Sequence, residues 1–392
     1  MRILFLNEKR GYFGGVEQNI ADSVAGLRAR GHRCFLAYAE DTARDAPGYG
    51  ELFDETHRCV EAGAAEDAMT LAAIAEKTTP DVLYFHKIPA LPERSALPAI
   101  RCVRYVHDHD LCCPRHHKYF VHNTRICRHP AGWRCWLDLA FVARDRSSPL
   151  GLRFQTLGPL MAELGRHREL DGLLTGSRFM RDELVMNGIA AERIHLLPPV
   201  VRMEEAAAVP LPEEPRILFV GQLIRGKGVD LLLRALALLD VPFTATIVGD
   251  GNARAGLEAL AGKLGLDGRV TFAGWVDNRA IGAHYAAARV LAVPARWPEP
   301  FGMIGLEAMR HGRPVVAFRA GGIEDWLADG ETGVLVGEQD VPAYARALAL
   351  LLGDHALAVR MGEAARERVR SLYNFDDYLK RLEGLLAGES ST

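Results

Sequence analysis

The stretch PRILFVGQLIRGKGVDLLLRALALL, residues 215–239, decides the fold of this chain. Its apolar run from Ile217 to Val220 predicts a buried strand, its glycines predict a tight loop, and its leucines after Val229 predict a helix. The same order of elements occurs at the beginning, in RILFLNEKRGYFGGVEQNI, residues 2–20. Two copies of one strand–loop–helix plan predict two similar domains, the number expected for 392 residues.

Short apolar runs alternate with helical patterns through both halves. They are HRCFLAYA, DVLYFHK and CVRYVHDHD in the first half, and FTATIVGDG, RVTFAGW, RVLAVPA and PVVAFRA in the second. Strands that alternate with helices form parallel sheets covered on both faces, so we predict an α/β fold with two doubly wound parallel-sheet domains. The rhythm is lost only between Leu111 and Arg166.

The domain boundaries follow from a change in composition. LLPPVVRMEEAAAVPLPEEPR, residues 196–216, contains five prolines and stands directly before an apolar strand. We therefore expect a first domain over 1–198, a linker over 199–215, a second domain over 216–371 and a C-terminal helical segment over 372–392 that could pack back on the first domain.

The composition is that of an average globular protein, with 49% hydrophobic and 25% charged residues. A net charge of -3 provides no general attraction to nucleic acid, which we do not expect as a partner. The apolar run before Asn7 is too short for a signal peptide, and seven cysteines without a secretion signal suggest reduced thiols. We expect a cytoplasmic protein and leave open a peripheral contact with the inner membrane face.

Two glycine-bearing loops follow strands and precede helices. Gly11 to Glu17 contains adjacent glycines at Gly14 and Gly15, which allow close approach of a ligand to the backbone and to the free amides of the next helix. The loop from Gly221 to Gly228 adds Arg225 and Lys227, which suit a diphosphate. A tight turn and a solvated basic turn are the plain structural alternatives.

A third loop, in PEPFGMIGLEAMRHGRPVV over residues 298–316, places carboxylates around a helix start. We expect the helix to begin near Gly302, with the amides of Phe301, Gly302, Met303 and Ile304 free to bind an anion. Glu299 and Glu307 would then accept hydrogen bonds from sugar or ribose hydroxyls. The alternative makes Glu299 an exposed charge and Glu307 an ion-pair partner of a nearby arginine.

A fourth loop, RYVHDHDLCCPRHHKY, places His107 at the end of a strand in the first half. At a carboxyl end it could bind or polarise a hydroxyl, and Asp108 and His109 compete for that role.

With these loops in place, the chain resembles the retaining glycosyltransferases of family 4, glycosyl transferases group 1. The matching motifs are GGVE at Gly14, GQLIRGKG at Gly221, VGDG at Val248, EPFGMIGLEAMRHGRPVVA from Glu299 and GGIEDWLADGETGVLV from Gly321. The resemblance covers almost all of the second half and is looser in the first. It implies the GT-B fold, in which two Rossmann-like domains face a central cleft, the first on the acceptor side and the second binding a nucleotide sugar.

The resemblance also implies residue roles. His107 matches the active-site histidine near the transferring carbon, Glu299 would bind the donor sugar, Glu307 the ribose, and Lys227 the diphosphate. The amides of residues 301–304 would position sugar and phosphates, with Gly15 approaching the diphosphate. The family usually has arginine where this chain has Gln222, so Arg225 is the substitute cation that we expect. No metal ion is required when cations and helix amides neutralise the diphosphate.

We therefore expect transfer of a sugar from a nucleotide-sugar donor, with UDP- or GDP-sugars favoured, to an acceptor hydroxyl with retention of configuration. Glycans, lipid-linked molecules and small molecules are all compatible acceptors. Two alternatives remain: a nucleotide-sugar epimerase or hydrolase of the same fold, and a non-catalytic nucleotide-sugar-binding subunit, which Gln222 makes conceivable.

Cysteines and histidines cluster between Cys102 and Cys135, where five of the seven cysteines lie. Thiolate and imidazole are zinc ligands, yet the spacing of Cys113, Cys127 and Cys135 fits no standard zinc pattern. A structural zinc is thus the weaker hypothesis beside buried thiols. Seven Lys or Arg against two acidic residues between Arg101 and Arg134 would suit an anionic acceptor, or form a solvated positive face.

Overall fold

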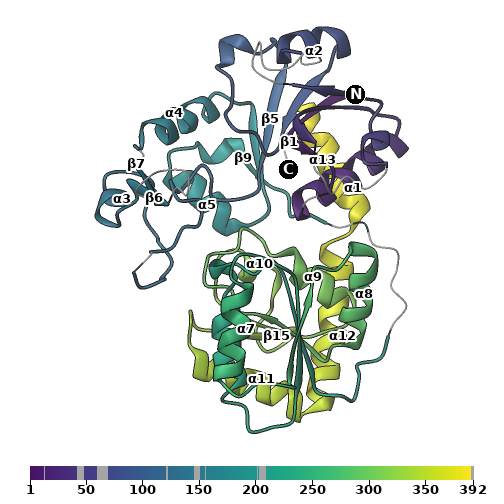
Figure 1. The fold of residues 1–392 in the computed structure, drawn as a ribbon. Helices are drawn as coiled ribbons and strands as arrows, with labels where there is room; N and C mark the ends of the chain where they lie inside the picture. The colour runs from purple at the N-terminus through teal and green to yellow at the C-terminus, as the bar shows by residue number, and fades with distance from the viewer. Residues whose placement is uncertain are drawn as a thin grey trace. The chain divides into compact units, whose positions relative to one another are not determined.

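The computed structural model describes residues 1–12, 14–41, 48–59, 69–120, 122–144, 151–154, 156–200, 202 and 209–389. These residues form two compact units, each of which has its own parallel sheet. Unit 1 comprises residues 1–116, 129–202 and 375–392, and unit 2 comprises 117–128 and 203–374. The α/β prediction with two parallel-sheet domains is confirmed (Figure 1).

Unit 1 contains a seven-stranded sheet in the order β3-β2-β1-β4-β5-β8-β9, and every neighbouring pair is parallel. Its strands are β1 (Arg2–Arg10), β2 (Arg33–Asp41), β3 (Glu55–Arg58), β4 (Val82–Phe85), β5 (Arg101–Val106), β8 (Gly172–Thr175) and β9 (Ile194–Leu196). The chain builds outward from β1 to β3 and then returns to place β4 on the other side of β1. The carboxyl ends of β1 and β4 are therefore the switch point of this sheet, where ligands of doubly wound folds bind.

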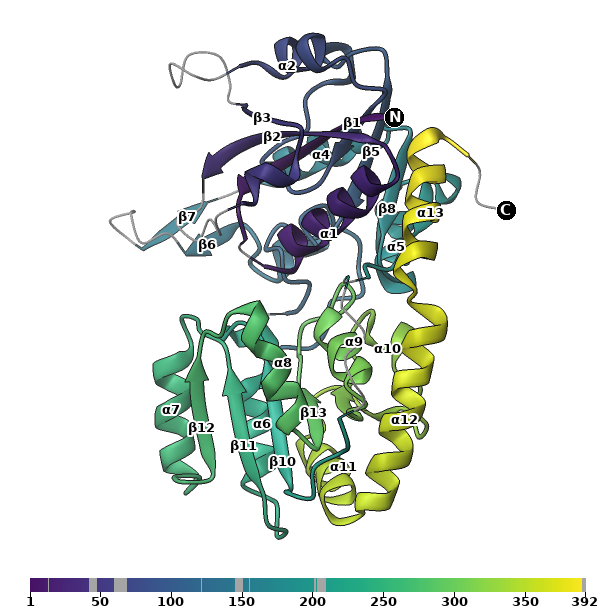
Figure 2. The same cartoon turned by 90° about the vertical axis from the view of Figure 1, so that its right-hand side faces the viewer.

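Helices cover both faces of this sheet. They are α1 (Gly15–Ala29), α2 (Leu71–Thr78), α4 (Gly158–His167), α5 (Arg178–Met186) and α13 (Phe375–Ala387). Leu4, Leu6, Leu83 and Phe85 alternate along β1 and β4 and belong to one apolar cluster with residues of α2, α4 and α5. On α1, Ser23 lies 2.9 Å from the hydroxyl of Tyr378 on α13, so residues far apart in the chain pack side by side (Figure 2).

Unit 2 contains a six-stranded parallel sheet in the order β12-β11-β10-β13-β14-β15. The strands are β10 (Arg216–Val220), β11 (Thr244–Val248), β12 (Val270–Gly274), β13 (Val290–Val293), β14 (Val315–Phe318) and β15 (Gly333–Val336). The order again switches direction between the first and fourth strands, here β10 and β13. The loops after these two strands therefore begin at neighbouring points of the sheet edge.

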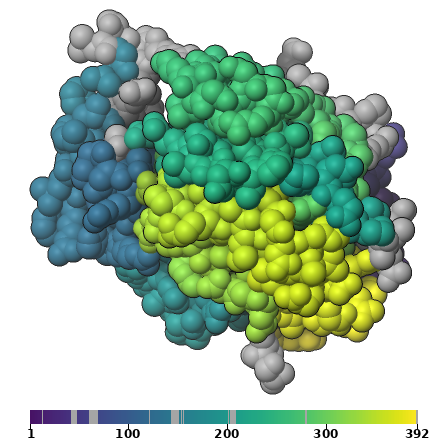
Figure 3. Space-filling model, turned by 90° about the horizontal axis from the view of Figure 1, so that it is seen from below, coloured from purple at the N-terminus to yellow at the C-terminus, as the bar shows by residue number. Residues whose placement is uncertain are grey.

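The helices of unit 2 are α6 (Val229–Leu236), α7 (Arg254–Lys263), α8 (Asn278–Ala287), α9 (Met303–Arg310), α10 (Ile323–Trp326), α11 (Val341–Gly353) and α12 (His355–Leu372). Ile217 and Phe219 of β10 alternate toward a buried cluster that α6, α7 and α11 share. In Figure 1, α7 and α11 lie on one side of the sheet and α8 and α12 on the other. Helices α11 and α12 pack against each other and form part of the surface seen from below (Figure 3).

The segment His117–Arg128 departs from the expected domain boundaries. The sequence places it inside the first domain, whereas its contacts group it with unit 2. Thr124 donates its hydroxyl to Gln339 Oε1 at 2.7 Å, and Arg128 pairs with Glu338 at 2.5 Å. The segment lies in the region without a clear strand–helix rhythm, which also contains the short helix α3 (Arg134–Leu137) and the antiparallel hairpin of β6 (Val142–Arg144) and β7 (Leu152–Phe154).

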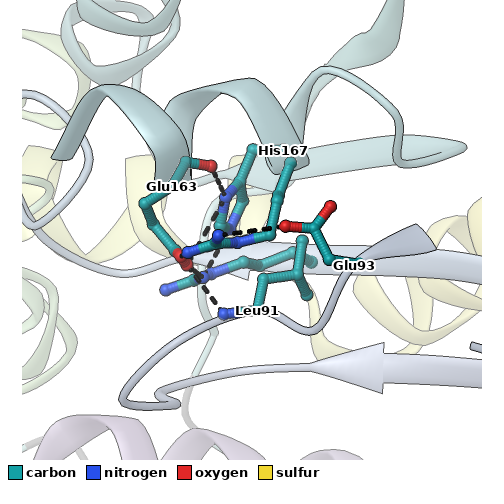
Figure 4. A network of polar contacts seen from close by, with 6 residues as sticks. Leu91, Glu93, Glu163 and His167 are labelled. Atoms are coloured by element: carbon teal, nitrogen blue, oxygen red, sulfur yellow. Dashed lines mark hydrogen bonds and ion pairs between the residues drawn. The ribbon is translucent and has the colours of Figure 1, made fainter. Parts of the chain in front are cut away.

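A buried polar network fastens α4 to the sheet of unit 1 (Figure 4). Arg104 of β5 donates to His167 Nε2, and His167 Nδ1 lies 2.7 Å from the carbonyl of Glu163, to which it donates. Burial, and next the charge of Arg104, lowers the pKa of His167 to about 3, so the ring is neutral. The Glu163 carboxylate lies 3.5 Å from Arg104 and accepts the backbone amide of Leu91 at 2.9 Å.

Replacement of Glu163 by alanine should lower the free energy of unfolding by about 3 kcal/mol, because it leaves the Arg104 guanidinium buried without its carboxylate. Chemical denaturation at neutral pH measures this loss. The control is Glu367→Ala, which removes a carboxylate from an exposed ion pair with Arg370 and should cost less than about 1 kcal/mol. Equal losses in the two variants would contradict the assigned role of Glu163.

Candidate active site

The switch point of unit 2 brings Lys227 and Glu299 together. Lys227 lies in the loop after β10 and Glu299 in the loop after β13, and Lys227 Nζ is 2.7 Å from Glu299 Oε1. Trp297 donates its indole N–H to the same oxygen at 2.8 Å, and the ammonium of Lys227 lies 5.0 Å from the centre of its ring. Glu299 is only 4% exposed, so the alternative of an exposed loop charge is wrong.

The backbone around this ion pair is held by close packing. Gly228 has φ +70, and a Cβ there would lie 1.9 Å from the carbonyl oxygen of Pro294, so only glycine fits. Arg296 pairs with Asp230 at 2.7 Å and donates to the carbonyl of Arg225 at 3.2 Å. These contacts bind the two loops to each other and thereby fix the distance between Lys227 and Glu299.

Helix α9 begins at Met303, beside Glu299, close to the predicted start at Gly302. Gly302 has φ +93, which turns the chain from the loop into the helix. The indole of Trp326 donates to the carbonyl of Phe301 at 2.6 Å, and Gly322 N–H donates to the carbonyl of Glu299 at 2.7 Å. The loop is therefore pinned on both sides of Pro300. Of the four residues whose amides are predicted to bind an anion, Met303 and Ile304 lie in the first turn of α9, and Phe301 and Gly302 lie just before it.

Glu307, in the second turn of α9, accepts a hydrogen bond from Tyr285 of α8 at 2.7 Å. Burial raises the pKa of Glu307. The hydrogen bond from Tyr285 and the charge of Arg310 act in the opposite direction and lower this pKa. His311 at the end of α9 stacks on Tyr285 with ring centres 5.4 Å apart, and burial lowers its pKa. The hydroxyl therefore holds one of the two carboxylate oxygens of Glu307.

Gln222 and Arg225 have exposed side chains that form no ion pair with other described residues. Arg225 stands two residues before Lys227 on the same short turn, Arg225–Lys227. Its charge therefore lies close to Lys227 in the sequence, on the same loop as Gln222.

The glycine loop at the switch point of unit 1 contacts an acidic side chain of the helix that follows it. Gly14 N–H donates to the Glu17 carboxylate at 3.0 Å, so the first turn of α1, which begins at Gly15, already carries an acidic group. Asn7 of β1 donates to Glu17 at 3.4 Å and accepts the backbone amide of Lys87 at 3.2 Å. Burial raises the pKa of Glu17, although three hydrogen bonds oppose this.

His107 follows β5 and lies half-buried in a stack of rings. Its Nε2 is 2.9 Å from His86 Nδ1, and its ring lies 4.4 Å from that of Tyr105. Burial lowers the pKa of His107 to about 3; Asp108 opposes this, and Arg104 and Lys87 add to it. The His107 ring is therefore neutral. Of the two nitrogens that face each other, His107 Nε2 and His86 Nδ1, one carries a hydrogen and donates a hydrogen bond to the other.

The two competitors of His107 are accounted for by other contacts. His109 is fully buried and meets the edge of Phe179. Asp108 pairs with Lys87 at 2.8 Å; burial opposes its ionisation, but Lys87 and the hydrogen bonds from Asp110 lower its pKa to about 2. His86 and Lys87 were not predicted as site residues, although they follow strand β4 at the same edge of the sheet as His107, a position that marks candidate residues in the sequence.

The zinc hypothesis for Cys113, Cys127 and Cys135 is not supported. No three His, Cys, Asp or Glu among the described residues come together in a way that could hold a metal ion. All seven cysteines are free thiols, and Cys127 belongs to unit 2 while the other two belong to unit 1.

Comparisons with known proteins identify the family. The family model described as Glycosyltransferase Family 4 matches residues 13–205, and the model described as Glycosyl transferases group 1 matches residues 202–368. Between them the two models match most of the chain. The fold is that of the GT-B glycosyltransferases, and the chain belongs to glycosyltransferase family 4.

Among curated proteins, the chain is 33% identical over 168 residues to the lipopolysaccharide core biosynthesis glycosyltransferase LpsE of Rhizobium meliloti, covering 43% of this chain and 48% of LpsE. It is 33% identical over 232 residues to a GDP-mannose-dependent phosphatidylinositol monomannoside mannosyltransferase of Mycolicibacterium smegmatis, covering 54% and 61%. The match thus spans about half the length of these relatives. HepE from Anabaena, solved with UDP and glucose, has a TM-score of 0.72 at 19% identity and 99% coverage of both chains.

We predict strong coupling between Lys227 and Glu299. Lys227→Met leaves the nearly buried Glu299 carboxylate with the Trp297 indole as its remaining side-chain partner among the described residues, and should lower the free energy of unfolding by about 2 kcal/mol or more. The double variant with Glu299→Gln should lose clearly less than the sum of the two single changes. Denaturant melts of the four proteins measure the coupling, and the exposed pair Lys380–Asp377 provides a control cycle expected near zero. Additive losses at Lys227 and Glu299 would argue against a shared site.

Proposed function

We propose that this protein is a retaining glycosyltransferase that moves a sugar from a nucleotide-sugar donor, a UDP- or GDP-sugar, to an acceptor hydroxyl. The observation that carries the proposal is the Lys227–Glu299 ion pair, joined by the Trp297 indole at the switch point of unit 2 and beside the start of α9. A buried carboxylate next to a cation and to helix amides suits a ligand that has both hydroxyls and phosphates.

The donor would be held by three kinds of group. Glu299 would accept hydrogen bonds from the sugar hydroxyls and Glu307 from the ribose, since ionised carboxylates are acceptors only. Lys227 and Arg225 would neutralise the diphosphate, together with the amides at residues 301–304. When the donor binds, the Lys227 ammonium would turn partly from Glu299 toward the diphosphate. Its positive charge would then be shared between the carboxylate and the phosphates.

The charges that grow on the donor in the transition state explain how these groups would catalyse sugar transfer. As the bond from the anomeric carbon to the diphosphate breaks, positive charge grows on the sugar and negative charge on the leaving phosphate. Cations and amides fixed in place stabilise this separation more than the intact donor. We propose that the acceptor hydroxyl attacks from the face that the phosphate leaves, passing its proton to the departing phosphate oxygen, which gives retention without an enzyme nucleophile or a metal ion.

From unit 1 we propose His107 as a hydrogen-bonding group near the transferring carbon and Gly15 as a contact of the diphosphate. Because the His107 ring is neutral, it can hold a sugar hydroxyl or the acceptor without adding charge. A glycan, a lipid-linked molecule or a small molecule would serve as acceptor. The names of the relatives, a lipopolysaccharide core enzyme and a phosphatidylinositol mannosyltransferase, favour a lipid-linked one. We also propose a peripheral contact with the inner membrane face.

A thermal-shift screen with UDP, GDP, ADP, dTDP and CMP, alone and with their common sugars attached, tests the proposal. A ligand at 100 times its Kd stabilises the fold by about 2.7 kcal/mol, which raises the melting temperature measurably. One nucleotide should stand out and define the donor. No shift with any of them would remove the proposed donor site, and steady turnover without acceptor would instead identify a hydrolase or epimerase.

Glu299→Ala should abolish sugar transfer while leaving binding of the nucleoside diphosphate within about threefold, because a nucleoside diphosphate lacks the sugar that Glu299 would hold. Glu307→Ala should weaken that binding by about 1.5–3 kcal/mol, the size of a lost hydrogen bond to a charged group. Calorimetric titration with the nucleotide from the screen separates the two effects. Identical, small effects of both variants on binding and transfer would contradict the assignment.

Tyr285→Phe should make nucleotide binding more sensitive to acid. Loss of the hydroxyl removes a hydrogen bond to the ionised form of Glu307, so the pKa of Glu307, already raised by burial, rises further. Protonation removes the acceptor, and binding should therefore fall at a higher pH than in the parent protein. Arg310 and His311 are the other titratable groups close to this pair.

The matched control for that pH profile is Tyr344→Phe. Tyr344 is also fully buried in unit 2, but it donates to the carbonyl of Val316 at 2.7 Å. Both variants should lose some stability, and only Tyr285→Phe should shift the pH dependence of binding. A shift of the same size in both variants would show that the changed pH dependence of binding reflects a general loss of packing in unit 2 and not the contact between Tyr285 and Glu307.

A further inference from the structure

Unit 1 exposes large apolar side chains on α3, on the residues after it and on the β6–β7 hairpin. Trp133 is 68% exposed, Leu137 76% and Phe154 75%, and Trp136 and Leu139 are also exposed. We call these five residues, together with the half-buried Phe141, the aromatic patch. Single exposed leucines are ordinary on protein surfaces, but a continuous group of large apolar side chains marks a binding surface.

The aromatic patch is continuous because its rings stack in a row. Trp136 lies 5.4 Å from Phe141, and Phe141 lies 6.4 Å from Phe154, with interplanar angles of 23° and 6°. Val142 of β6 pairs with Phe154 of β7, so the hairpin sets the last ring in line with the others. Figure 1 shows α3, β6 and β7 together at an edge of unit 1, away from its sheet.

The sequence that carries the aromatic patch is basic. Residues 133–144 and 151–154 contain three arginines, Arg134, Arg144 and Arg153, and one acidic residue, Asp138. The Asp138 carboxylate is 2.6 Å from Arg115, and both side chains are largely buried, so this acid is neutralised within the protein. Arg134 is exposed and lies over the Trp133 ring at 5.6 Å.

We propose that the aromatic patch docks this protein onto an anionic lipid bilayer, with the rings at the level of the headgroups and Arg134 against lipid phosphates. Tryptophan prefers the membrane interface, where its ring is partly apolar and its N–H stays solvated. Arginine beside such rings adds attraction to anionic lipid. A second copy of the chain fits less well, because a symmetric contact would bring the same arginines together.

This inference locates the membrane contact that the proposed function includes, and it can fail separately. Vesicle binding is measured with the full chain and without donor, acceptor or turnover. A protein that binds nucleotide but not vesicles would lose this inference and keep the donor site. A protein that binds vesicles but no nucleotide would lose the proposed donor site and keep the membrane contact.

The experiment is co-sedimentation with vesicles of phosphatidylcholine alone and with vesicles containing about one third phosphatidylglycerol. The parent protein should bind the anionic vesicles, and high salt should weaken binding because it screens the arginines. The variant Trp133→Ala with Leu137→Ser should bind at least about tenfold more weakly, since two apolar anchors are removed. Arg134→Glu should also weaken binding to anionic vesicles.

The matched control replaces two exposed leucines of unit 2, Leu238→Ser with Leu350→Ser, and should bind like the parent. All variants change exposed side chains, and their melting curves should stay close to that of the parent. Absence of binding to either vesicle overturns the proposal, as does equal binding by the patch and control variants. Light scattering that shows a dimer which only the patch variant disrupts, together with no vesicle binding, overturns it in favour of self-association.

Discussion

Parallel pairing of β10 with both β11 and β13 is the constraint on which the rest of unit 2 depends. It forces the loops after β10 and β13 to start side by side, although their residues are about 70 positions apart in the chain. Lys227 and Glu299 meet for that reason, and a glycine at Gly228 allows the approach. Unit 1 repeats the constraint with β1 between β2 and β4, which places Asn7 against the amide of Lys87.

Both units also bury polar groups, and they do so in different ways. Unit 1 keeps its interior histidines neutral: burial lowers the pKa of His86 and brings the pKa values of His107 and His167 to about 3. Unit 2 keeps a charge pair at Lys227 and Glu299 and a carboxylate held by a tyrosine hydroxyl at Glu307. Neutral rings suit hydrogen bonds with hydroxyl groups. A lysine–glutamate pair near helix amides suits a bound anion, which can replace the glutamate as a partner of the lysine.

Much of this arrangement could be predicted from the sequence, because strands and glycine loops leave local patterns. The apolar runs around Ile217 and Val290 predicted strands, and the parallel order predicted that the loops after them would carry the site. Partners contributed by side chains from distant elements leave no such pattern. Tyr285 reaches Glu307 from α8, and Trp297 turns back onto Glu299, contacts that only packing determines. The sequence also could not show that His117–Arg128 groups with unit 2, because its contacts there come from residues distant in the chain. They include two hydrogen bonds between Thr124 and Gln339 and an ion pair between Arg128 and Glu338.

Helix α13 has a consequence for the order in which the units form. Tyr378 reaches Ser23 on α1, and Glu383 binds both Arg30 and His32, so residues after 374 complete the packing of α1. A chain made from the N-terminus on the ribosome therefore has every strand and helix of unit 2 available before unit 1 receives this partner. We expect unit 2 to reach its native state first during synthesis, with α1 presenting an uncovered apolar face until α13 emerges.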